Sequence, residues 1–350
     1  MKKVWLWIRI LISLGLIAFL LYTVDFGDMS GSLAGSNSYY LLAALLVGFG
    51  DRFLMAYKWN ILLQAKSIHI PLLRVTAIYL ISSFLGLFLP ATVGGDAIRA
   101  YAVSKGGQKG RDIVSSIVVE RLFGILALLI FVLISITLSI FVFGQSFFAS
   151  IWSLFGVILL VFLFLSAFIY LSLNRSLLQR LYLLIAGRNS KINENKWVGK
   201  LKGIFHSYLA YQEHKKELGV FLFWSFLENL FPIFWTYFLA LAFNIPVPLL
   251  YLFILEPIVL VLVRLPISID GIGIKEGAFV YFLTLIGIPS SDALLLGIAS
   301  HVLGVISILP GGVLYGLNGL GVRRNMAKQG VNMGVSADAK DMRGKEENLA

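Results

Sequence analysis

Long apolar runs separated by short polar segments dominate this chain. Six of the runs reach the roughly 20 residues that a helix needs to cross the hydrocarbon core of a bilayer. They lie near 4–24, 39–63, 113–143, 148–173, 218–243 and 292–318. Two more apolar regions, 75–104 and 249–287, are interrupted by Pro, Gly and charged residues. The pattern predicts an all-α polytopic membrane protein with about six full transmembrane helices and two broken segments.

Composition supports this assignment and narrows the chemistry. Hydrophobic residues make up 59% of the chain and charged residues 13%, against about 25% charged residues in soluble domains. We expect one transmembrane domain over 1–325 and, because the sequence turns polar beyond it, a disordered cytoplasmic tail at 326–350. The absence of Cys excludes disulfides, thiolate metal sites and Cys nucleophiles. The four His are scattered without metal-ligand spacing, so we expect neither a metal nor a cofactor.

Basic residues predict the orientation of the spans. Lys and Arg are absent from 25–38, 144–147, 244–248 and 288–292, whereas they occur at both ends of the chain and in the other connections. The basic connections should therefore be cytoplasmic, as should both termini, in the cytoplasmic membrane. The net charge of +11 is explained by this orientation, and we expect no nucleic-acid partner. The basic loop at 174–217 has helical apolar spacing; it either lies on an anionic leaflet or is a solvated linker.

The alternation of connections with and without Lys and Arg predicts from which side the two broken segments enter the membrane. Segment 75–104 has to enter and leave from the cytoplasm, and segment 249–287 from outside. Each is then a re-entrant hairpin, because arms of about 15 residues are shorter than a full span. The alternative is an ordinary pair of complete spans. The helices that flank the two hairpins run in opposite directions, which predicts an inverted repeat of the kind found in transporters.

Charged residues inside apolar segments are the candidates for function. A charge at the bilayer centre costs about 2.5–3.5 kcal/mol on insertion scales, so such groups face the protein interior or a wet cavity. Asp96 and Arg99 follow a Gly pair whose free amides could hold an anion such as a phosphate at a helix N-terminus. Lys275 and Glu276 repeat the arrangement in the second half. The candidate substrate-binding residues are Arg52, Gly94, Gly95, Asp96, Arg99, Glu120, Arg121, Glu228, Glu256, Arg264, Gly271, Gly273, Lys275 and Glu276.

A structural interpretation of the same residues stays open. The charges could form internal salt bridges that lock the hairpins to the surrounding helices. Glu228 and Glu256 have no adjacent base, so they are candidates either for proton-linked carboxylates or for partners of Arg52 and Arg121.

Three stretches carry a family resemblance: FLGLFLPATVGGDAIRAY at 84–101, VVERLFGILAL at 118–128 and LPISIDGIGIKEGAFVYFL at 265–283. In this order they resemble the lysylphosphatidylglycerol synthase transmembrane-region family, also described as flippase-like membrane proteins. The resemblance extends to about residue 322. The positions that match the family motifs are Pro90, Gly94, Gly95, Asp96, Arg99, Glu120, Arg121, Pro266, Gly271, Gly273, Glu276 and Gly277. The usual motif has Arg where this chain has Lys275, which keeps the charge but loses the bidentate fork.

The resemblance implies a function. In multiple peptide resistance factors this membrane domain is associated with moving aminoacylated phospholipids between leaflets, and a fused soluble domain transfers lysine to phosphatidylglycerol. We expect this chain to have the flippase-like membrane domain without the transferase domain. It would then be a lipid translocase and not an enzyme. Its lipid would be an anionic or aminoacylated phospholipid or a polyprenyl-phosphate lipid. The alternatives are lysylphosphatidylglycerol synthesis by lysyl transfer, or a non-catalytic partner of a lipid-modifying synthase. The expected partners are membrane lipids (phosphatidylglycerol derivatives or polyprenyl phosphates), with a synthase and a second copy in a homodimer as further candidates.

The topology can be tested because the native chain has no Cys. A Cys at Ser190, in the basic loop, should react with an impermeant maleimide only after the cells are permeabilised. A matched Cys at Ser146, in a connection without Lys or Arg, should react in intact cells. Labelling of the Ser190 position from outside would contradict the orientation.

Overall fold

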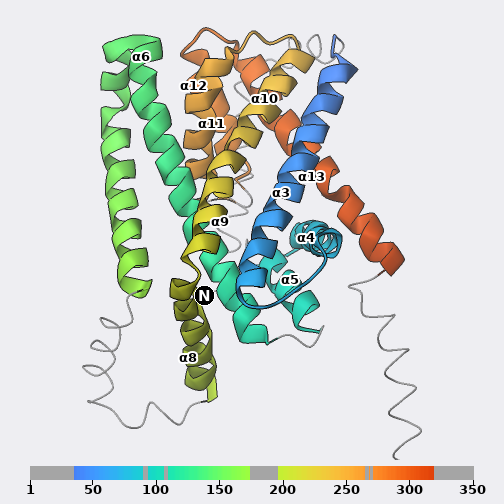
Figure 1. The fold of residues 1–350 in the computed structure, drawn as a ribbon. Helices are drawn as coiled ribbons and strands as arrows, with labels where there is room; N and C mark the ends of the chain where they lie inside the picture. Colours follow the sequence, from blue (N-terminus) through green and yellow to red (C-terminus); the bar gives the residue numbers. More distant parts are fainter. Residues whose placement is uncertain are drawn as a thin grey trace, which may run out of the picture.

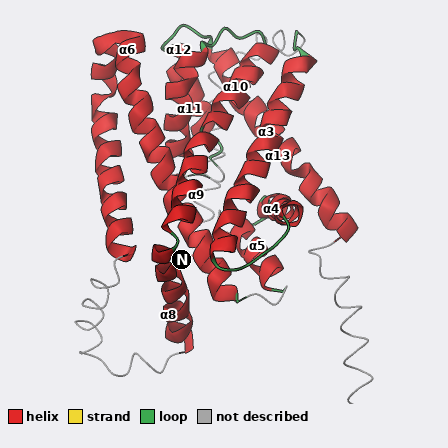
Figure 2. Ribbon diagram, in the orientation of Figure 1, coloured by secondary structure: helices red, strands yellow, loops and turns green. Residues whose placement is uncertain are grey.

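The computed structural model describes residues 35–89, 94–105, 109–173, 196–264, 268 and 271–318. Within these residues every regular element is a helix and no strand occurs (Figure 1; Figure 2). The all-α prediction is therefore confirmed for this part of the chain. The predicted first span near 4–24 and the predicted tail at 326–350 lie outside the described residues.

Five helical stretches among the described residues are long and apolar enough to cross a membrane. They are α3 (Ser38–Ala65), two arms of α6 (Gly110–Ser139 and Phe155–Leu173), α9 with α10 (Lys215–Ala242), and α13 (Ser290–Asn318) over Ser290–Leu317. These stretches coincide with the five spans predicted between positions 39 and 318, so the prediction of multiple membrane-spanning helices is confirmed there.

Helix α6 (Gly110–Leu173) departs from the sequence prediction at its turn. Residues 144–147 were expected to form an outside loop, but they are helical, and α6 forms two arms that lie side by side (Figure 1). Leu129 and Val132 of the first arm pack in one cluster with Ile158 of the second. The segment contains no Pro, so the turn can keep its backbone hydrogen bonds within helical structure, as an apolar environment requires.

The two broken segments form pairs of short helices. The first contains α4 (Leu72–Gly86) and α5 (Gly94–Ser104), and the second contains α11 (Leu249–Arg264) and α12 (Ile274–Thr284). With 11 to 16 residues, every one of them is shorter than the roughly 20 residues of a full span. In Figure 1, α4 and α5 lie in the lower half of the bundle and α11 and α12 in the upper half.

Part of the basic loop is docked onto the bundle. Helix α8 (Lys196–Leu209) packs against α6, and the short helix η2 (Ala210–Glu213) leads into α9 (Lys215–Glu228). The Lys66 amino group donates to the Ser207 carbonyl oxygen at 2.5 Å, and the Tyr211 hydroxyl donates to the Leu62 carbonyl oxygen at 2.9 Å. Partial burial lowers the pKa of Lys66 below its ordinary value. The helical spacing predicted for this part of the loop is confirmed, while residues 174–195 lie outside the described part.

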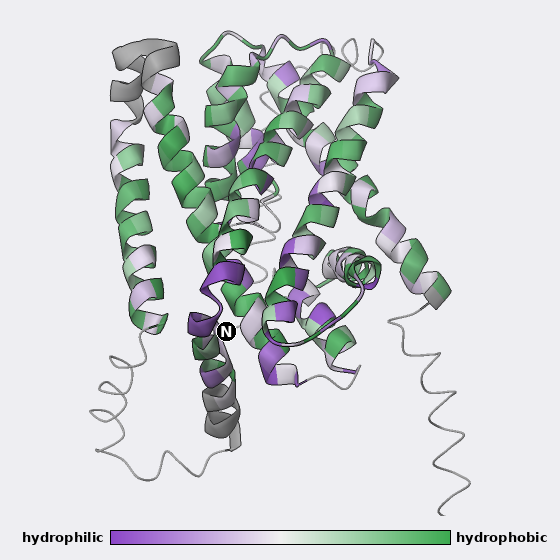
Figure 3. Ribbon diagram, viewed as in Figure 1, coloured by the Kyte–Doolittle hydropathy of each residue, from purple (hydrophilic) through white to green (hydrophobic). Residues whose placement is uncertain are grey.

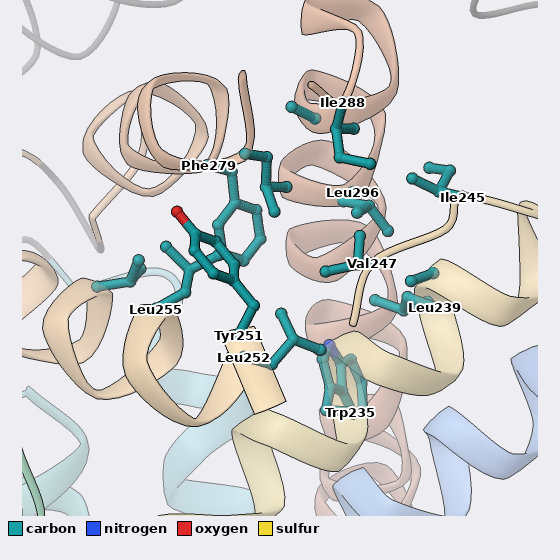
Figure 4. Close-up of a cluster of buried hydrophobic side chains, with 14 of the residues drawn as sticks. Trp235, Leu239, Ile245, Val247, Tyr251, Leu252, Leu255, Phe279, Ile288 and Leu296 are labelled. Carbon is teal, nitrogen blue, oxygen red and sulfur yellow. The ribbon is translucent and has the colours of Figure 1, made fainter. Parts of the chain in front are cut away.

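The largest apolar cluster holds the second pair of short helices in place (Figure 4). Trp235 of α10 (Leu230–Ala242), Leu252 of α11, Phe279 of α12 and Leu296 of α13 all belong to it. The Tyr251 hydroxyl also donates to the Phe282 carbonyl oxygen at 2.7 Å, which links α11 to α12. Lipid tails are as apolar as these side chains, so close packing rather than exclusion from water is what stabilises the arrangement.

Helix α13 crosses α4 at two adjacent glycines. A Cβ atom added at Gly311 would lie 2.2 Å from the Leu80 carbonyl oxygen, and one at Gly312 would lie 2.7 Å from the Phe84 ring. Both positions therefore need glycine for the helices to approach this closely. The contact fixes α4, and through it α5, against the C-terminal half of the chain.

This crossing predicts a difference between two substitutions on one helix. Gly311→Ala should lower the free energy of unfolding by about 1–3 kcal/mol, because the new methyl group overlaps backbone atoms of α4. Gly316→Ala is the matched control, since nothing lies within 4 Å of its Cβ position. Thermal unfolding of both purified variants in detergent measures the difference, and equal melting temperatures would contradict the crossing.

Candidate functional site

Ionisable side chains gather inside the bundle, next to the tips of the short helices. Figure 3 shows hydrophobic residues along most of the helices, with hydrophilic residues on the lower part of α3, on α5 and at the start of α9. The contacts define two groups. The first charge cluster consists of Asp96, Arg99, Glu120 and Arg121. The second charge cluster consists of Glu256, Lys275, Glu276 and His301.

Arg99 is the centre of the first charge cluster. Its side chain is 2% exposed. One guanidinium nitrogen donates to Asp96 Oδ1 at 2.7 Å, and another lies 2.7 Å from Glu120 Oε2 in an ion pair. The guanidinium group also lies 4.8 and 4.9 Å from the ring centroids of Trp59 and Tyr79, within the range of cation–π contacts. Arg99 is thus enclosed by two carboxylates and two aromatic rings.

Asp96, in the first turn of α5, lies between two basic side chains. Asp96 lies one helical turn before Arg99, and its second oxygen accepts from Arg121 Nε at 3.0 Å and pairs with Nη2 at 2.8 Å. Gly95 brings α5 against α4, because a Cβ there would lie 3.0 Å from the Ser82 carbonyl oxygen. Two carboxylates and two guanidinium groups make this cluster formally neutral, which limits the cost of burying it.

A second ion pair extends the network to α3 and α9. The Lys58 amino group pairs with the Glu228 carboxylate and donates to Ser225 Oγ at 3.1 Å. Glu228 stands at the break between α9 and α10, where Asn229 interrupts the span. Lys58 also lies within electrostatic range of Glu120. Lys58 was not among the predicted residues, although its position inside an apolar run is the same signal that selected Arg52.

Two arginines lie within electrostatic range of each other at the exposed edge of this network. The Arg121 side chain is 56% exposed, and Arg264, the last residue of α11, is exposed as well. They are close enough for their positive charges to repel each other. Arg52 is partly buried, and its guanidinium group donates to Met55 Sδ at 3.4 Å. The edge therefore carries cations from both halves of the chain.

The second charge cluster joins four helices. Glu276 of α12 accepts from the Gly273 backbone amide at 2.7 Å, and its other oxygen lies 2.5 Å from His301 Nδ1 on α13. The Lys275 amino group donates to Ser300 Oγ at 2.5 Å. Trp235 of α10 donates to the same hydroxyl oxygen at 2.9 Å. Glu256 is 1% exposed, accepts from the Thr236 hydroxyl and lies within electrostatic range of Lys275.

The predicted glycines have structural roles in the fold. Gly271 and Gly273 adopt φ values of 76° and 84°, in the left-handed region that favours glycine. The Gly273 amide, which we expected to be free for an anion, already donates to Glu276. Gly94 and Gly95 pack closely against Leu89 and α4. The glycines therefore serve close packing of α5 and the start of α12, and the exposed cations are on neighbouring side chains.

The structure thus brings most of the predicted residues together and adds several more. Trp59, Tyr79, Ser300 and His301 belong to the contacts, yet no sequence spacing connects them to the motifs. The motif positions Pro90 and Pro266 lie outside the described residues, as does Asp270. Among the described residues, no group of three or more His, Asp or Glu could hold a metal ion.

Two comparisons relate the chain to known proteins. The family model for the lysylphosphatidylglycerol synthase TM region matches residues 6–312. A UPF0104 membrane protein of Pyrococcus horikoshii is 20% identical over 289 residues, which cover 79% of this chain and 85% of that protein. The family match includes every residue of both charge clusters.

The enclosure of Arg99 predicts that it is required for folding. Arg99→Gln should lower the free energy of unfolding by about 3–5 kcal/mol, because Asp96 and Glu120 would both lose their shared buried cation. Arg121→Gln removes the same chemical group from the exposed edge of the cluster and should cost much less. Thermal unfolding in detergent compares the two variants. Equal stability would show that Arg99 is not a structural cation.

Proposed function

Because the chain belongs to the lysylphosphatidylglycerol synthase transmembrane-region family, we propose that it is a lipid translocase. In this proposal it moves an anionic lipid between the leaflets of the cytoplasmic membrane. The candidate lipids are an anionic or aminoacylated phospholipid and a polyprenyl phosphate, which share a phosphate group. In this proposal the membrane domain moves lipids between leaflets and does not transfer lysine to them.

The observation that carries the proposal is that Arg121 and Arg264, both exposed, lie within electrostatic range of each other beside a buried charge network. Although Arg121 also pairs with Asp96, its positive charge and that of Arg264 repel each other, and a bound anion would reduce this repulsion. Arginine presents planar donors that match the oxygens of a phosphate. A lipid phosphate that enters from the side of the bundle would therefore be held between α6 and α11.

The short helices supply the second line of support. We propose that α4–α5 and α11–α12 are re-entrant hairpins that open to opposite sides of the membrane, related by an inverted repeat. Their lengths and their positions in the lower and upper halves of the bundle agree with this arrangement (Figure 1). Arg121 lies beside the tip of the first hairpin and Arg264 at the tip of the second. Movement of one hairpin against the other would expose the bound phosphate alternately to each side.

Arg99, unlike Arg121 and Arg264, is not proposed to bind the headgroup directly. It is closed off by Asp96, Glu120, Trp59 and Tyr79, so direct contact with a headgroup requires this cage to open. Its main contribution is to hold Asp96 in position for Arg121.

The function is tested with purified protein in liposomes. Fluorescent phosphatidylglycerol, its lysyl ester and labelled undecaprenyl phosphate are offered separately, and the fraction of each that reaches the opposite leaflet is followed by quenching from outside. At least one should move faster than in protein-free vesicles. No movement of any of the three, or formation of lysylphosphatidylglycerol from lysyl-tRNA in the same vesicles, would overturn the proposal.

Arg121 and Arg264, the two arginines at the exposed edge, should determine the rate of lipid transport. Arg121→Gln and Arg264→Gln should each slow transport by about 10- to 100-fold, because a charge-assisted hydrogen bond contributes about 1.5–3 kcal/mol. Arg111→Gln is the matched control, since Arg111 is also an exposed arginine on α6 but lies at its first turn. Normal transport by both edge variants would exclude them from the site.

A further inference from the structure

The two charge clusters differ in composition. The first holds two acids and two arginines. The second contains a carboxylate paired with a histidine, Glu276 with His301. This pair carries a formal charge of −1 with a neutral imidazole and zero with an imidazolium. Because an uncompensated charge is costly in a buried site, a proton on His301 would change the charge balance beside α12.

His301 is the member that can exchange this proton. Its Nδ1 lies 2.5 Å from Glu276 Oε1, and its side chain is 26% exposed, whereas Glu276 is 6% exposed. Glu256 is 1% exposed. When Nδ1 carries the hydrogen that faces Glu276, Nε2 is the position that accepts a second proton. An ordinary imidazole changes charge between about pH 5 and 8, which is the range in which a membrane protein meets a proton gradient.

Other ionisable groups are present on the helices packed against α12 and α13. They are Tyr251, Glu256 and Arg264 of α11, Tyr237 of α10, Arg74 and Tyr79 of α4, Tyr39, Tyr40, Asp51, Arg52, Tyr57 and Lys58 of α3, Lys275 and Tyr281 of α12 itself, and Asp292 and Tyr315 of α13 itself. Among the described residues, His301 is the ionisable side chain paired with Glu276. Protonation of His301 therefore changes the charge of the Glu276–His301 pair itself, whereas the other groups act on the pair from a distance.

We propose that Glu276 and His301 form a proton-binding site that takes up one proton at His301 Nε2 and thereby neutralises this pair. Protonation turns the contact between the two residues into an ion pair with a charge-assisted hydrogen bond, which is stronger than the neutral one. That this proton drives or gates lipid movement rests on the proposed function. Binding of the proton itself does not.

The site is placed where a change of charge can move the second hairpin. Glu276 caps the first turn of α12 through the Gly273 amide. On the other side, Gly297 of α13 packs directly on Glu276, and a Cβ there would lie 3.0 Å from its Cα. Protonation of His301 therefore draws the start of α12 toward α13, and loss of the proton loosens this contact.

Nuclear magnetic resonance of ¹⁵N-labelled histidine tests proton binding without any lipid assay. The variant H69Q/H206Q/H214Q keeps His301 as its one histidine, because the chain contains four. The imidazole signal in nanodiscs should change reversibly from neutral to charged between pH 5 and 8. A signal that keeps one protonation state from pH 5 to 9 would overturn the proposal. This measurement uses the native His301, so it decides the question even where a substitution at that position prevents folding.

The transport assay tests the coupling. Wild-type protein in liposomes should move its lipid at a rate that changes at least threefold between pH 5 and 8, and His301→Gln should lose this pH dependence. His206→Gln is the matched control, because His206 is exposed on α8 and should leave the profile unchanged. A wild-type profile in His301→Gln would overturn the coupling. If wild-type protein moves none of the three lipids, the proposed function fails, and the histidine titration still decides whether the proton site exists.

Discussion

A guanidinium group inside a membrane bundle has to be matched by nearby carboxylates, and the pairing of Arg99 with Asp96 and Glu120 is the constraint on which the first half of this structure depends. The three residues come from two helices, and the aromatic rings of Trp59 and Tyr79 add α3 and α4. Four helices are therefore fixed by one buried cation. The same pairing positions Arg121, because Arg121 binds the Asp96 oxygen that does not contact Arg99.

The second half meets the same constraint in a different way. Lys275 donates to the hydroxyl group of Ser300, and Glu276 is paired with His301. One half of the protein thus pairs its carboxylates with arginines, and the other pairs one with a histidine. In the proposed proton site this difference lets the first half stay fixed while the second changes its charge.

Much of the architecture could be predicted because membranes restrict the choice of structure. Apolar length alone identified the five spanning stretches that the structure describes, and Pro and Gly in 75–104 and 249–287 correctly indicated broken helices. The turn of α6 was predicted wrongly, because a polar connection and a helical turn of the same length look alike in sequence. Lys58 was overlooked although it stands inside an apolar run, and His301 was not connected to Glu276, because the two residues are 25 positions apart.

The sequence by itself determined that charges must be buried at the hairpin tips, since residues such as Arg99 and Glu276 stand inside apolar segments where no other arrangement is stable. Only the tertiary structure decided which charge meets which. Partners such as Lys58 and Glu228 lie on different helices, and their distance depends on how the helices cross rather than on spacing along the chain. The same holds for access: Arg99 and Arg121 are equally polar in sequence, and packing encloses the first and leaves the second at the exposed edge.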